Sequence, residues 1–290
     1  EQAQLYFYTS GSTGEPKKIP RTLRQLLNEV QGLSQSFSFD EHATAIATVS
    51  HQHIYGLLFK LLLPLATGRS FYNPQMAFPE DVVQAQKQLE TIGLSNYLIS
   101  SPALLKRWTT DVILQHCQMV FSSGGKLESG VRPLLNRPII EVLGSSETGG
   151  IAHRAKDEDA WTAFSNVAIR IEDQQLMVKS NHAYENDWIT TGDGAVWTDA
   201  TCQTFKLMGR TDRIVKLEEK RLSLDAIEQS IQALDVVKQC HVLVFEHEQR
   251  QMLGCIVVLT EQAREQLQQQ VKSAFVSHLK QQLKDGLETI

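Results

Sequence analysis

Short apolar segments alternate with helical segments through the first half of the chain. The apolar segments are typical of buried strands and span residues 43–49, 96–101, 119–121 and 139–143. Between the first two of them, residues 55–65 and 79–92 have the apolar content and spacing of helices. Strands that alternate with helices form a mainly parallel sheet with helices on its faces. We therefore predict an α/β fold.

Loops rich in glycine and serine follow three of the predicted strands. They are residues 9–14, which follow a short aromatic strand at 5–8, residues 122–125 and residues 144–148. In parallel α/β sheets, ligands bind beyond the carboxyl ends of the strands. We therefore expect the three loops to converge on one ligand.

The pattern changes near residue 167, where strands and hairpins replace the alternation. A polar segment, Gly209-Arg210-Thr211-Asp212, follows them. Beyond it, the sequence predicts a strand at 214–217, a helix at 225–234, strands at 236–245 and 253–259, and a helix from residue 260 towards 283. We predict a large N-terminal domain of residues 1–210, with a mainly parallel sheet and a β-hairpin region, followed by a small α+β C-terminal domain of residues 211–290.

Charge and hydropathy exclude several classes of function. The formal net charge is −5, which argues against a surface that neutralises nucleic-acid phosphates. No apolar run reaches the roughly 20 residues that cross a bilayer, and no basic segment opens the chain, so we expect neither a membrane span nor a signal peptide. The four cysteines, Cys117, Cys202, Cys240 and Cys255, never approach a CxxC spacing, which predicts free thiols in a reducing cytoplasm and no zinc cluster.

The segment from Thr9 to Lys17 has the composition of a phosphate-binding loop. Its hydroxyls and backbone N–H groups can hydrogen-bond phosphate oxygens, its glycines allow close approach, and a lysine supplies positive charge. It is not the Walker pattern GxxxxGK[ST], because Pro16 stands where the second glycine is needed. Clusters of this kind are more often flexible surface loops, so composition alone leaves both interpretations open.

The string TSGSTGEPK over residues 9–17 resembles the phosphate loop of the adenylate-forming superfamily, which contains acyl-CoA synthetases, adenylation domains and luciferases. Three further segments resemble this superfamily, in the order in which its members carry them: Gly144-Ser145-Ser146-Glu147, Thr191-Gly192-Asp193, and GRTDRIVK over residues 209–216. Together they span nearly the whole chain. The resemblance implies a fragment that lacks both ends of such an enzyme.

The resemblance also implies roles for individual residues. Thr9, Ser10, Gly11, Ser12, Thr13, Gly14 and Lys17 would hold the ATP phosphates, and Gly124, Gly125, Leu143, Gly144, Ser145 and Ser146 would lie against the nucleotide. Glu147 would bind Mg²⁺, a hard cation that prefers oxygen ligands, while Asp193 would bind the ribose hydroxyls and Arg210 the ribose or a phosphate. Thr9, Lys17, Glu147 and Arg210 form the implied catalytic group, His53 and Gly144 border the substrate pocket, and Asp212 is the hinge of the small domain. Outside this context, Glu147, Asp193 and Arg210 would be ordinary loop, turn and surface residues, and His53 a packing residue.

The implied reaction has two halves. A carboxylate attacks the α-phosphate of ATP and expels pyrophosphate, and a thiol of CoA or of a carrier-protein phosphopantetheine then accepts the acyl group. Members that activate amino acids carry an Asp in the segment equivalent to residues 50–56, and this chain has none there. The resemblance therefore implies a fatty or aromatic acid as the substrate.

Three features depart from the superfamily pattern. Leu143 replaces an aromatic residue that stacks on adenine, and Glu218-Glu219 occupies a turn that usually carries glycine. No segment of the form P-x-x-x-x-G-K, with its catalytic lysine, follows Thr260. These departures leave open a second class of function, a nucleotide-binding module without turnover that serves regulation or interaction. The phosphate loop and Glu147 favour the acid–thiol ligase.

Overall fold

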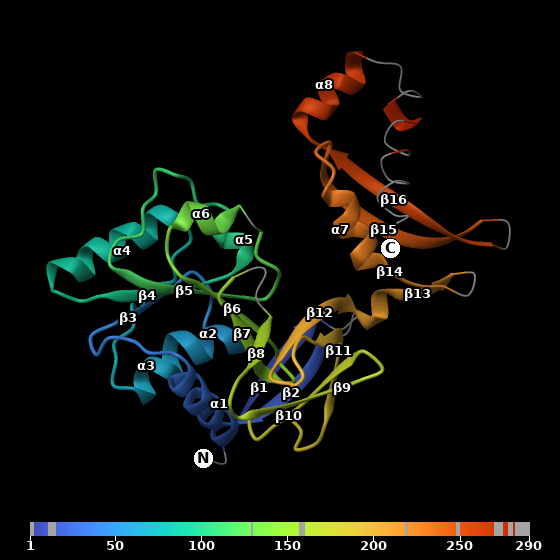
Figure 1. The fold of residues 1–290 in the computed structure, drawn as a ribbon. Coiled ribbons are helices and arrows are strands. Elements are labelled where there is room, and N and C mark those ends of the chain that lie inside the picture. The colour runs from blue at the N-terminus through green and yellow to red at the C-terminus, as the bar shows by residue number, and fades with distance from the viewer. Residues whose placement is uncertain are drawn as a thin grey trace. The chain divides into compact units, whose positions relative to one another are not determined.

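The computed structural model of the chain describes residues 3–10, 16–128, 130–156, 160–217, 220–247, 250–269, 275–277 and 281 (Figure 1). Its contacts divide the chain into two units. The first contains Glu1–Glu172, Leu176–Thr191 and Trp197–Lys206, and the second contains Asp173–Gln175, Gly192–Val196 and Leu207–Ile290. The domain boundary predicted after residue 210 stays a prediction. Within the described parts of the chain, no helix has the length and apolar character needed to cross a bilayer.

Four neighbouring strands of a ten-stranded sheet run parallel to one another. They are β3 (Thr44–Ala47), β4 (Asn96–Ser100), β5 (Cys117–Ser123) and β6 (Ile139–Ser145). They coincide with the four apolar segments of the sequence, and the helices between them form the crossovers that parallel strands need. The predicted α/β class is confirmed.

The remaining six strands continue the sheet beyond β6. In spatial order they are β7 (Gly149–Arg154), β8 (Trp161–Ala163), β12 (Thr204–Arg210), β11 (Ile189–Trp197), β10 (Gln175–Ser180) and β9 (Val167–Glu172). β7 is antiparallel to β6, and β8 is antiparallel to both β7 and β12. The sheet is therefore mixed, and the predicted hairpin region extends the parallel part rather than standing apart from it.

Helices cover both faces of the parallel strands (Figure 1). They are α1 (Leu23–Ser36), α2 (Ile54–Gly56), the π-helix η1 (Leu57–Leu62), α3 (Leu63–Ala66), α4 (Pro79–Thr91), α5 (Pro102–Leu105) and α6 (Val131–Leu135). Ala45 and Ile99 pack in one core with α1, η1 and α3, while Ile46 and Leu98 pack in the other with α4, α5 and α6. Because successive strand residues point to opposite faces, strands buried on both sides are apolar throughout.

An antiparallel hairpin opens the described chain. β1 (Gln4–Ser10) pairs with β2 (Pro16–Thr22) along its whole length, with Thr9 opposite Lys17. Thr22 then forms a capping box with Gln25, in which each side chain accepts a hydrogen bond from the backbone N–H of the other residue. The cap fixes the hairpin to the start of α1. The segment that joins the two strands, residues 11–15, lies outside the described residues.

The second unit has the α+β content that the sequence predicts. Its elements are η2 (Thr211–Arg213), β13 (Ile214–Leu217), β14 (Lys220–Ser223), α7 (Leu224–Gln232), β15 (Val237–His247), β16 (Arg250–Leu259) and α8 (Glu261–Gln269). The apolar face of α7, with Ile227 and Ile231, packs against Val237 and Val242 of β15. Most of the predicted helix beyond residue 269 lies outside the described residues.

Gly56 ends α2 against the backbone of the preceding turn, and it provides a test of this packing. A Cβ atom at Gly56 would lie 2.1 Å from the carbonyl oxygen of Ser50. We predict that Gly56→Ala lowers the free energy of unfolding by about 2 kcal/mol or more, because backbone atoms have to move to admit the methyl group. Thermal unfolding should show a fall in Tm of several degrees.

Gly130→Ala is the matched control for this substitution. Gly130 has a φ of −68°, which suits any residue, and a Cβ atom there meets nothing within 4 Å. The variant should keep the wild-type Tm or exceed it slightly. Equal effects of the two substitutions would contradict the packing argument.

Candidate active site

The hairpin and the turn after β6 bring two predicted site residues together. Lys17 Nζ lies 3.3 Å from Glu147 Oε1, and the two side chains are 54% and 25% exposed. Thr9 stands opposite Lys17 in the hairpin, so its backbone is fixed beside the same pair. Of the other residues predicted to bind phosphate, Ser10 ends β1, while Gly11, Ser12, Thr13 and Gly14 lie outside the described residues.

The turn that carries Glu147 is held by its own hydroxyl groups. The backbone N–H of Ser145 donates to Thr148 Oγ1 over 3.1 Å, and the N–H of Thr148 donates to Ser145 Oγ over 3.2 Å. The carbonyl of Glu147 accepts a hydrogen bond of 3.0 Å from the N–H of Tyr184, whose ring centre lies 5.6 Å from Lys17 Nζ. The Glu147 carboxylate is therefore presented from a fixed backbone on the side where Lys17 lies.

A buried ion pair joins this turn to the hairpin and to α1. Arg21 of β2 is 0% exposed and Glu29 of α1 is 3% exposed, and Arg21 Nη2 donates to Glu29 Oε2 over 2.9 Å. Arg21 Nη1 also donates to the carbonyl of Ser146 over 3.1 Å, and Glu29 Oε1 accepts from the N–H of Gly150 over 2.6 Å. Burial lowers the pKa of Arg21, and the negative charge of Glu29 opposes that effect. The pair thus ties three segments of the sequence into one site.

His182 holds Gly150 from a second side. The side chain is buried, with Nε2 3.1 Å from the carbonyl oxygen of Gly150 and Nδ1 3.2 Å from Nδ2 of Asn166. Because an amide nitrogen only donates, these contacts assign Nδ1 as the acceptor and place the proton on Nε2. Burial is the main cause that lowers the pKa of His182, so the ring is neutral in the folded protein at pH 7.

The sequence analysis does not single out Arg21, Glu29 or His182. Arg21 follows two lysines and looks like a further loop cation, and His182 has no motif around it. The helical periodicity of the sequence does indicate that Glu29 is buried. Glu29 falls on the apolar stripe of α1, three residues after Leu26 and four before Leu33, where a carboxylate is buried and needs a partner.

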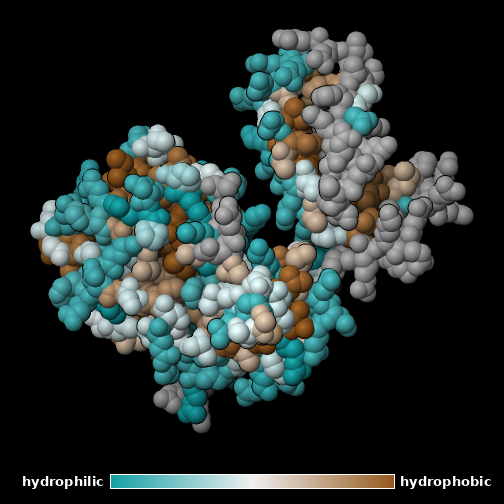
Figure 2. All heavy atoms as spheres, viewed as in Figure 1, coloured by the Kyte–Doolittle hydropathy of each residue, from teal (hydrophilic) through white to brown (hydrophobic). Residues whose placement is uncertain are grey.

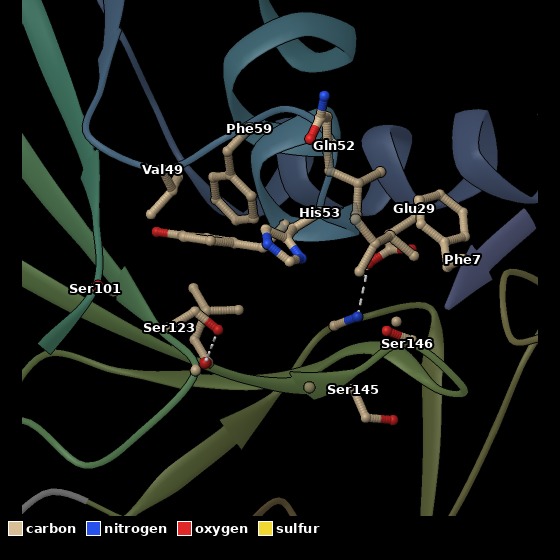
Figure 3. A pocket seen from close by; sticks show the side chains of 18 of the residues that line it. Phe7, Glu29, Val49, Gln52, His53, Phe59, Ser101, Ser123, Ser145 and Ser146 are labelled. Atoms are coloured by element: carbon tan, nitrogen blue, oxygen red, sulfur yellow. Dashed lines mark hydrogen bonds between the residues drawn. The ribbon is translucent and has the colours of Figure 1, made fainter. Parts of the chain in front are cut away.

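A cavity of about 420 Å³ opens beside the Glu147 turn (Figure 3). Its polar side lies at the ends of β5 and β6 and includes Ser123, Gly124, Gly144, Ser145 and Ser146, and its apolar side includes Phe7, Val49, Ile54, Tyr55, Leu58, Phe59 and Val142. His53, at the start of α2, reaches into the cavity from the side opposite Ser123 (Figure 3). Two of the three predicted loops therefore meet at one cavity, together with His53 and with Phe7 of β1. The roles of these residues stay predictions.

A π-helix builds part of the apolar side. η1 carries Leu58 and Phe59, which line the cavity and are both 2% exposed. Lys60 of the same helix is also 2% exposed, and its Nζ donates to the carbonyl of Asn73 over 2.8 Å. Burial lowers the pKa of Lys60. Single π-helical turns are rare and recur at functional sites, and here one directs two neighbouring apolar side chains to the cavity wall.

Two residues that were predicted to lie against the nucleotide do not line this cavity. Leu143 is half-buried on β6 and pairs with Ala152 of β7, and a Cβ atom at Gly125 would face Pro102 at 3.8 Å. Gly124 does line the cavity, and its φ of +88° is a conformation that favours glycine. Gly124 and Gly144 thus both line the cavity, and the roles predicted for the whole set stay predictions.

Asp193 and Arg210 lie together in the second unit. Arg210 Nη1 is 3.7 Å from Asp193 Oδ1, and Thr211 Oγ1 donates to the carbonyl of Gly192 over 3.0 Å. The Thr-Gly-Asp segment and the polar segment after β12 are therefore neighbours in space. The side chain of Asp212, the predicted hinge, lies outside the described residues.

α7 holds the residues on both sides of the predicted hinge. The backbone N–H of Arg210 donates to Asp225 Oδ2 over 2.9 Å. Arg213 binds Asp225 Oδ1 through Nε over 2.8 Å and Glu228 Oε1 through Nη2 over 2.5 Å. The segment between Arg210 and Arg213 is thus anchored at each end to the same helix.

The position of Glu147 is compatible with a bound magnesium ion. Within the described ranges, no group of three or more His, Cys, Asp or Glu side chains has a metal-binding arrangement. Mg²⁺ is commonly held by one or two carboxylates together with substrate phosphates and water, and not by an all-protein cage. Glu147, a partly exposed carboxylate beside the phosphate-loop hairpin, fits a site of that kind.

The sequence profile of one enzyme family covers most of the first unit. The chain belongs to the AMP-binding enzyme family, whose sequence profile matches residues 1–195.

Two curated relatives and two solved structures illustrate the similarity. The chain is 30% identical over 168 residues to a 4-coumarate–CoA ligase of Rhodobacter capsulatus, and the match covers 56% of this chain and 42% of the relative. It is 25% identical over 263 residues to the adenylate-forming reductase Nps11 of Serpula lacrymans, and the match covers 78% of this chain and 24% of the relative. Its fold is similar to ATP-bound MatB from Rhodopseudomonas palustris (TM-score 0.73, 19% identity, 92% of this chain and 61% of that one). It is also similar to MenE from Bacillus subtilis in complex with ATP and magnesium (TM-score 0.71, 16% identity, 88% and 59%). The chain spans less than half the length of these curated relatives.

The Arg21–Glu29 pair predicts a large loss of stability when one partner is removed. Glu29→Gln leaves the buried Arg21 guanidinium without its counter-charge, so we expect the free energy of unfolding to fall by about 3–5 kcal/mol. Urea unfolding followed by circular dichroism measures this. Glu172→Gln is the control, because Glu172 pairs with Arg170 at an exposed position, 59% and 48% exposed, and should cost less than about 1 kcal/mol. Similar losses in both variants would contradict the role of the buried pair.

His182 predicts a loss of stability on acidification. Its pKa in the folded protein lies below the usual 6.5, so the unfolded chain binds more protons between that lowered pKa and 6.5. The contribution of His182 is therefore complete above pH 6.5 and is lost as the pH falls, by at most about 1.4 kcal/mol per pH unit.

Urea midpoints at pH 7, 6 and 5 measure this dependence. His182→Gln should have a shallower decline than the wild type, because glutamine can make both hydrogen bonds without titrating. His116→Gln is the control, since His116 is exposed and pairs with Glu90 at the surface. Parallel pH profiles of the wild type and His182→Gln would show that His182 is not responsible.

Proposed function

We propose that the complete protein activates a carboxylic acid with ATP and then transfers the acyl group to a thiol. In the first half-reaction, a carboxylate oxygen attacks the α-phosphorus, the bond from that phosphorus to the β-phosphate oxygen breaks, and pyrophosphate leaves. In the second, the thiol sulfur attacks the acyl carbonyl carbon and AMP leaves. The observation that supports this proposal best is the pair of Lys17 and Glu147, 3.3 Å apart beside a cavity with one polar and one apolar side.

Lys17 and Glu147 serve the triphosphate in this proposal. Lys17 is more than half exposed, so its ammonium group can turn from Glu147 to phosphate oxygens. Glu147 would hold Mg²⁺, which neutralises charge on the phosphates when bound. Thr9 and the loop residues Ser10 to Gly14 would donate hydrogen bonds to the same oxygens. The backbone at Gly124 and Gly144 leaves room for the nucleotide at the polar side of the cavity.

Asp193 and Arg210 serve the nucleoside in this proposal. Asp193 has the acceptor oxygens that ribose hydroxyls need, and Arg210, 3.7 Å away, can orient that carboxylate or donate to the ribose or a phosphate. Asp212 is the hinge about which the small domain turns between the two half-reactions. This role rests on the resemblance alone, because Arg210 and Arg213 on either side of Asp212 are both held to α7 and their contacts do not support a pivot between them.

The apolar side of the cavity favours an aromatic acid as the substrate. Phe7, Tyr55 and Phe59 line it, and the ring centres of Tyr55 and Phe59 are 5.0 Å apart. A volume of about 420 Å³ is near the lower end of the range for ligand pockets, which suits a compact flat acid better than a long aliphatic chain. The similarity to a 4-coumarate–CoA ligase agrees with this class.

An amino acid is disfavoured as the substrate. Glu29 is the carboxylate among the described lining residues, and both of its oxygens are occupied, one by Arg21 and the other by the N–H of Gly150. A substrate ammonium group entering the cavity would have to break a buried ion pair to reach it.

CoA is the acceptor that we propose. The names of two similar proteins, 4-coumarate–CoA ligase and O-succinylbenzoate Coenzyme A Synthetase, support it. A carrier-protein phosphopantetheine presents the same thiol, and competition between CoA and purified carrier proteins in the second half-reaction distinguishes the two.

Carboxylate-dependent ATP–pyrophosphate exchange in the complete protein tests the proposal. We expect Lys17→Ala and Glu147→Ala each to lower the exchange rate by about 100-fold or more, because each removes charge stabilisation of the phosphates in the transition state. Benzoate-type acids should support faster exchange than aliphatic acids of ten or more carbons.

Lys18→Ala is the matched control for Lys17→Ala. Lys18 is the next residue on β2, points to the other face of the hairpin, and lies over the ring of Tyr6 at 3.7 Å. Its exchange rate should stay within about twofold of the wild type, as for a surface residue away from the chemistry. Wild-type exchange in both Lys17→Ala and Glu147→Ala would remove the site assignment. Nucleotide binding without exchange for any acid would instead identify a binding module without turnover.

A further inference from the structure

Two of the four cysteines, 15 positions apart in the sequence, come together in the second unit. In the β15–β16 ribbon, Cys240 pairs with Val257 and Cys255 pairs with Val242. Paired residues of antiparallel strands point to the same face, as do residues two apart on one strand. Cys240 and Cys255 are therefore diagonal neighbours on one face of the ribbon, and each thiol is near enough to affect the pKa of the other. Their spacing is not the CxxC pattern, so the sequence does not indicate that the two cysteines are neighbours.

The surroundings of the two thiols differ. Cys255 is exposed, whereas Cys240 is half-buried against the core of the unit and its Sγ donates to the carbonyl of Glu228 over 3.2 Å. Burial raises the pKa of Cys240 to about 11 and raises that of Cys255 as well. Both groups are thiols at neutral pH, so they react slowly there and faster as the pH rises.

We propose that Cys240 and Cys255 form a redox modification site, at which a low-molecular-weight disulfide such as oxidised glutathione closes them into a reversible cross-strand disulfide. The exposed Cys255 loses its proton and attacks one sulfur of the glutathione disulfide, whose S–S bond breaks and releases one glutathione thiolate. Cys240 then loses its proton, attacks Cys255 Sγ and expels the second glutathione. Two protein thiols are oxidised and one glutathione disulfide is reduced to two thiols.

The modification has a structural consequence within the same unit. Glu228, whose carbonyl accepts the Cys240 hydrogen bond, also accepts from Arg213 and from the backbone N–H of Val242. The disulfide thus crosslinks β15 to β16 beside the residues that anchor Arg213, and it closes residues 241–254 into a loop. A crosslink of this kind limits the unfolded chain more than the folded one, so the oxidised unit resists unfolding better. The inference does not depend on the proposed enzymatic activity.

The test uses the complete protein, reduced, desalted and incubated with oxidised glutathione at pH 8.5. Before alkylation, the oxidised chain should have a mass lower by about 2 Da than the fully reduced chain. Alkylation without reduction, followed by mass spectrometry, should then show two protected thiols and a crosslinked peptide pair containing Cys240 and Cys255. The initial rate should rise by up to about tenfold per pH unit, as the thiolate fraction does below the thiol pKa.

Two variants separate the steps of the exchange. Cys240→Ser keeps the attacking thiol and removes the resolving one, so it should accumulate one glutathione on Cys255. Cys255→Ser should form neither the crosslink nor that adduct. Cys202→Ser is the matched control, because Cys202 is also exposed, and it should form the crosslink as the wild type does. Four alkylatable thiols after oxidation, or a crosslink that uses Cys202, would overturn the proposal.

Discussion

The buried ion pair between Arg21 and Glu29 is the contact on which the site depends. It reaches from the hairpin to α1 and, through Ser146 and Gly150, to both sides of the Glu147 turn. Two charges are costly to remove from water unless each is paired and hydrogen-bonded. Arg21 also donates to the carbonyl of Ser146, and Glu29 also accepts from the N–H of Gly150. Moving the hairpin or α1 away would therefore leave a buried charge unpaired, and moving the turn away would break two buried hydrogen bonds. The contacts of this ion pair hold the hairpin beside the turn and so bring Lys17 and Glu147 together. Neither Lys17 nor Glu147 is buried enough for their own contact to do this.

The elements of the fold could be predicted from the sequence, whereas the arrangement of the later strands could not. The segment at 43–49 and the three apolar segments after it gave the parallel strands, since a strand buried on both faces has an unmistakable apolar run. Several of the strands beyond β7, such as β9 and β12, alternate between partly buried and exposed residues and have no continuous apolar run. Their pattern gives hairpins, but nothing local states that β8 pairs with β12, which lies 40 residues later. Such a pairing depends on how the complete strands pack against the rest of the protein.

The residues of the candidate site that lie in sequence motifs could be predicted, whereas the residues that hold the site together through buried contacts could not. Lys17 and Glu147 lie in motifs of the sequence, and the structure brings the two side chains together. Their roles at phosphate and magnesium stay predictions. Arg21 and His182 lie in no motif, and the type of a residue does not show whether its side chain is buried or exposed. Gly124 and Gly125 differ in a way that could not be predicted from the sequence. The sequence treats the two glycines alike, and only the backbone conformation distinguishes the one at the cavity.

The two sides of the cavity are built differently. On the polar side, the backbone at Gly150 is locked by buried groups, because its N–H donates to Glu29 and its carbonyl accepts from His182 Nε2. On the apolar side, side chains such as Phe59 make the wall, and a substitution there changes the shape of the cavity while the locked backbone stays in place. Lys60, buried on the same π-helix as Phe59, donates to the carbonyl of Asn73 and so ties that helix to the segment that follows it. Under the function that we propose, nucleotide binding and the choice of acid would therefore depend on different parts of the cavity.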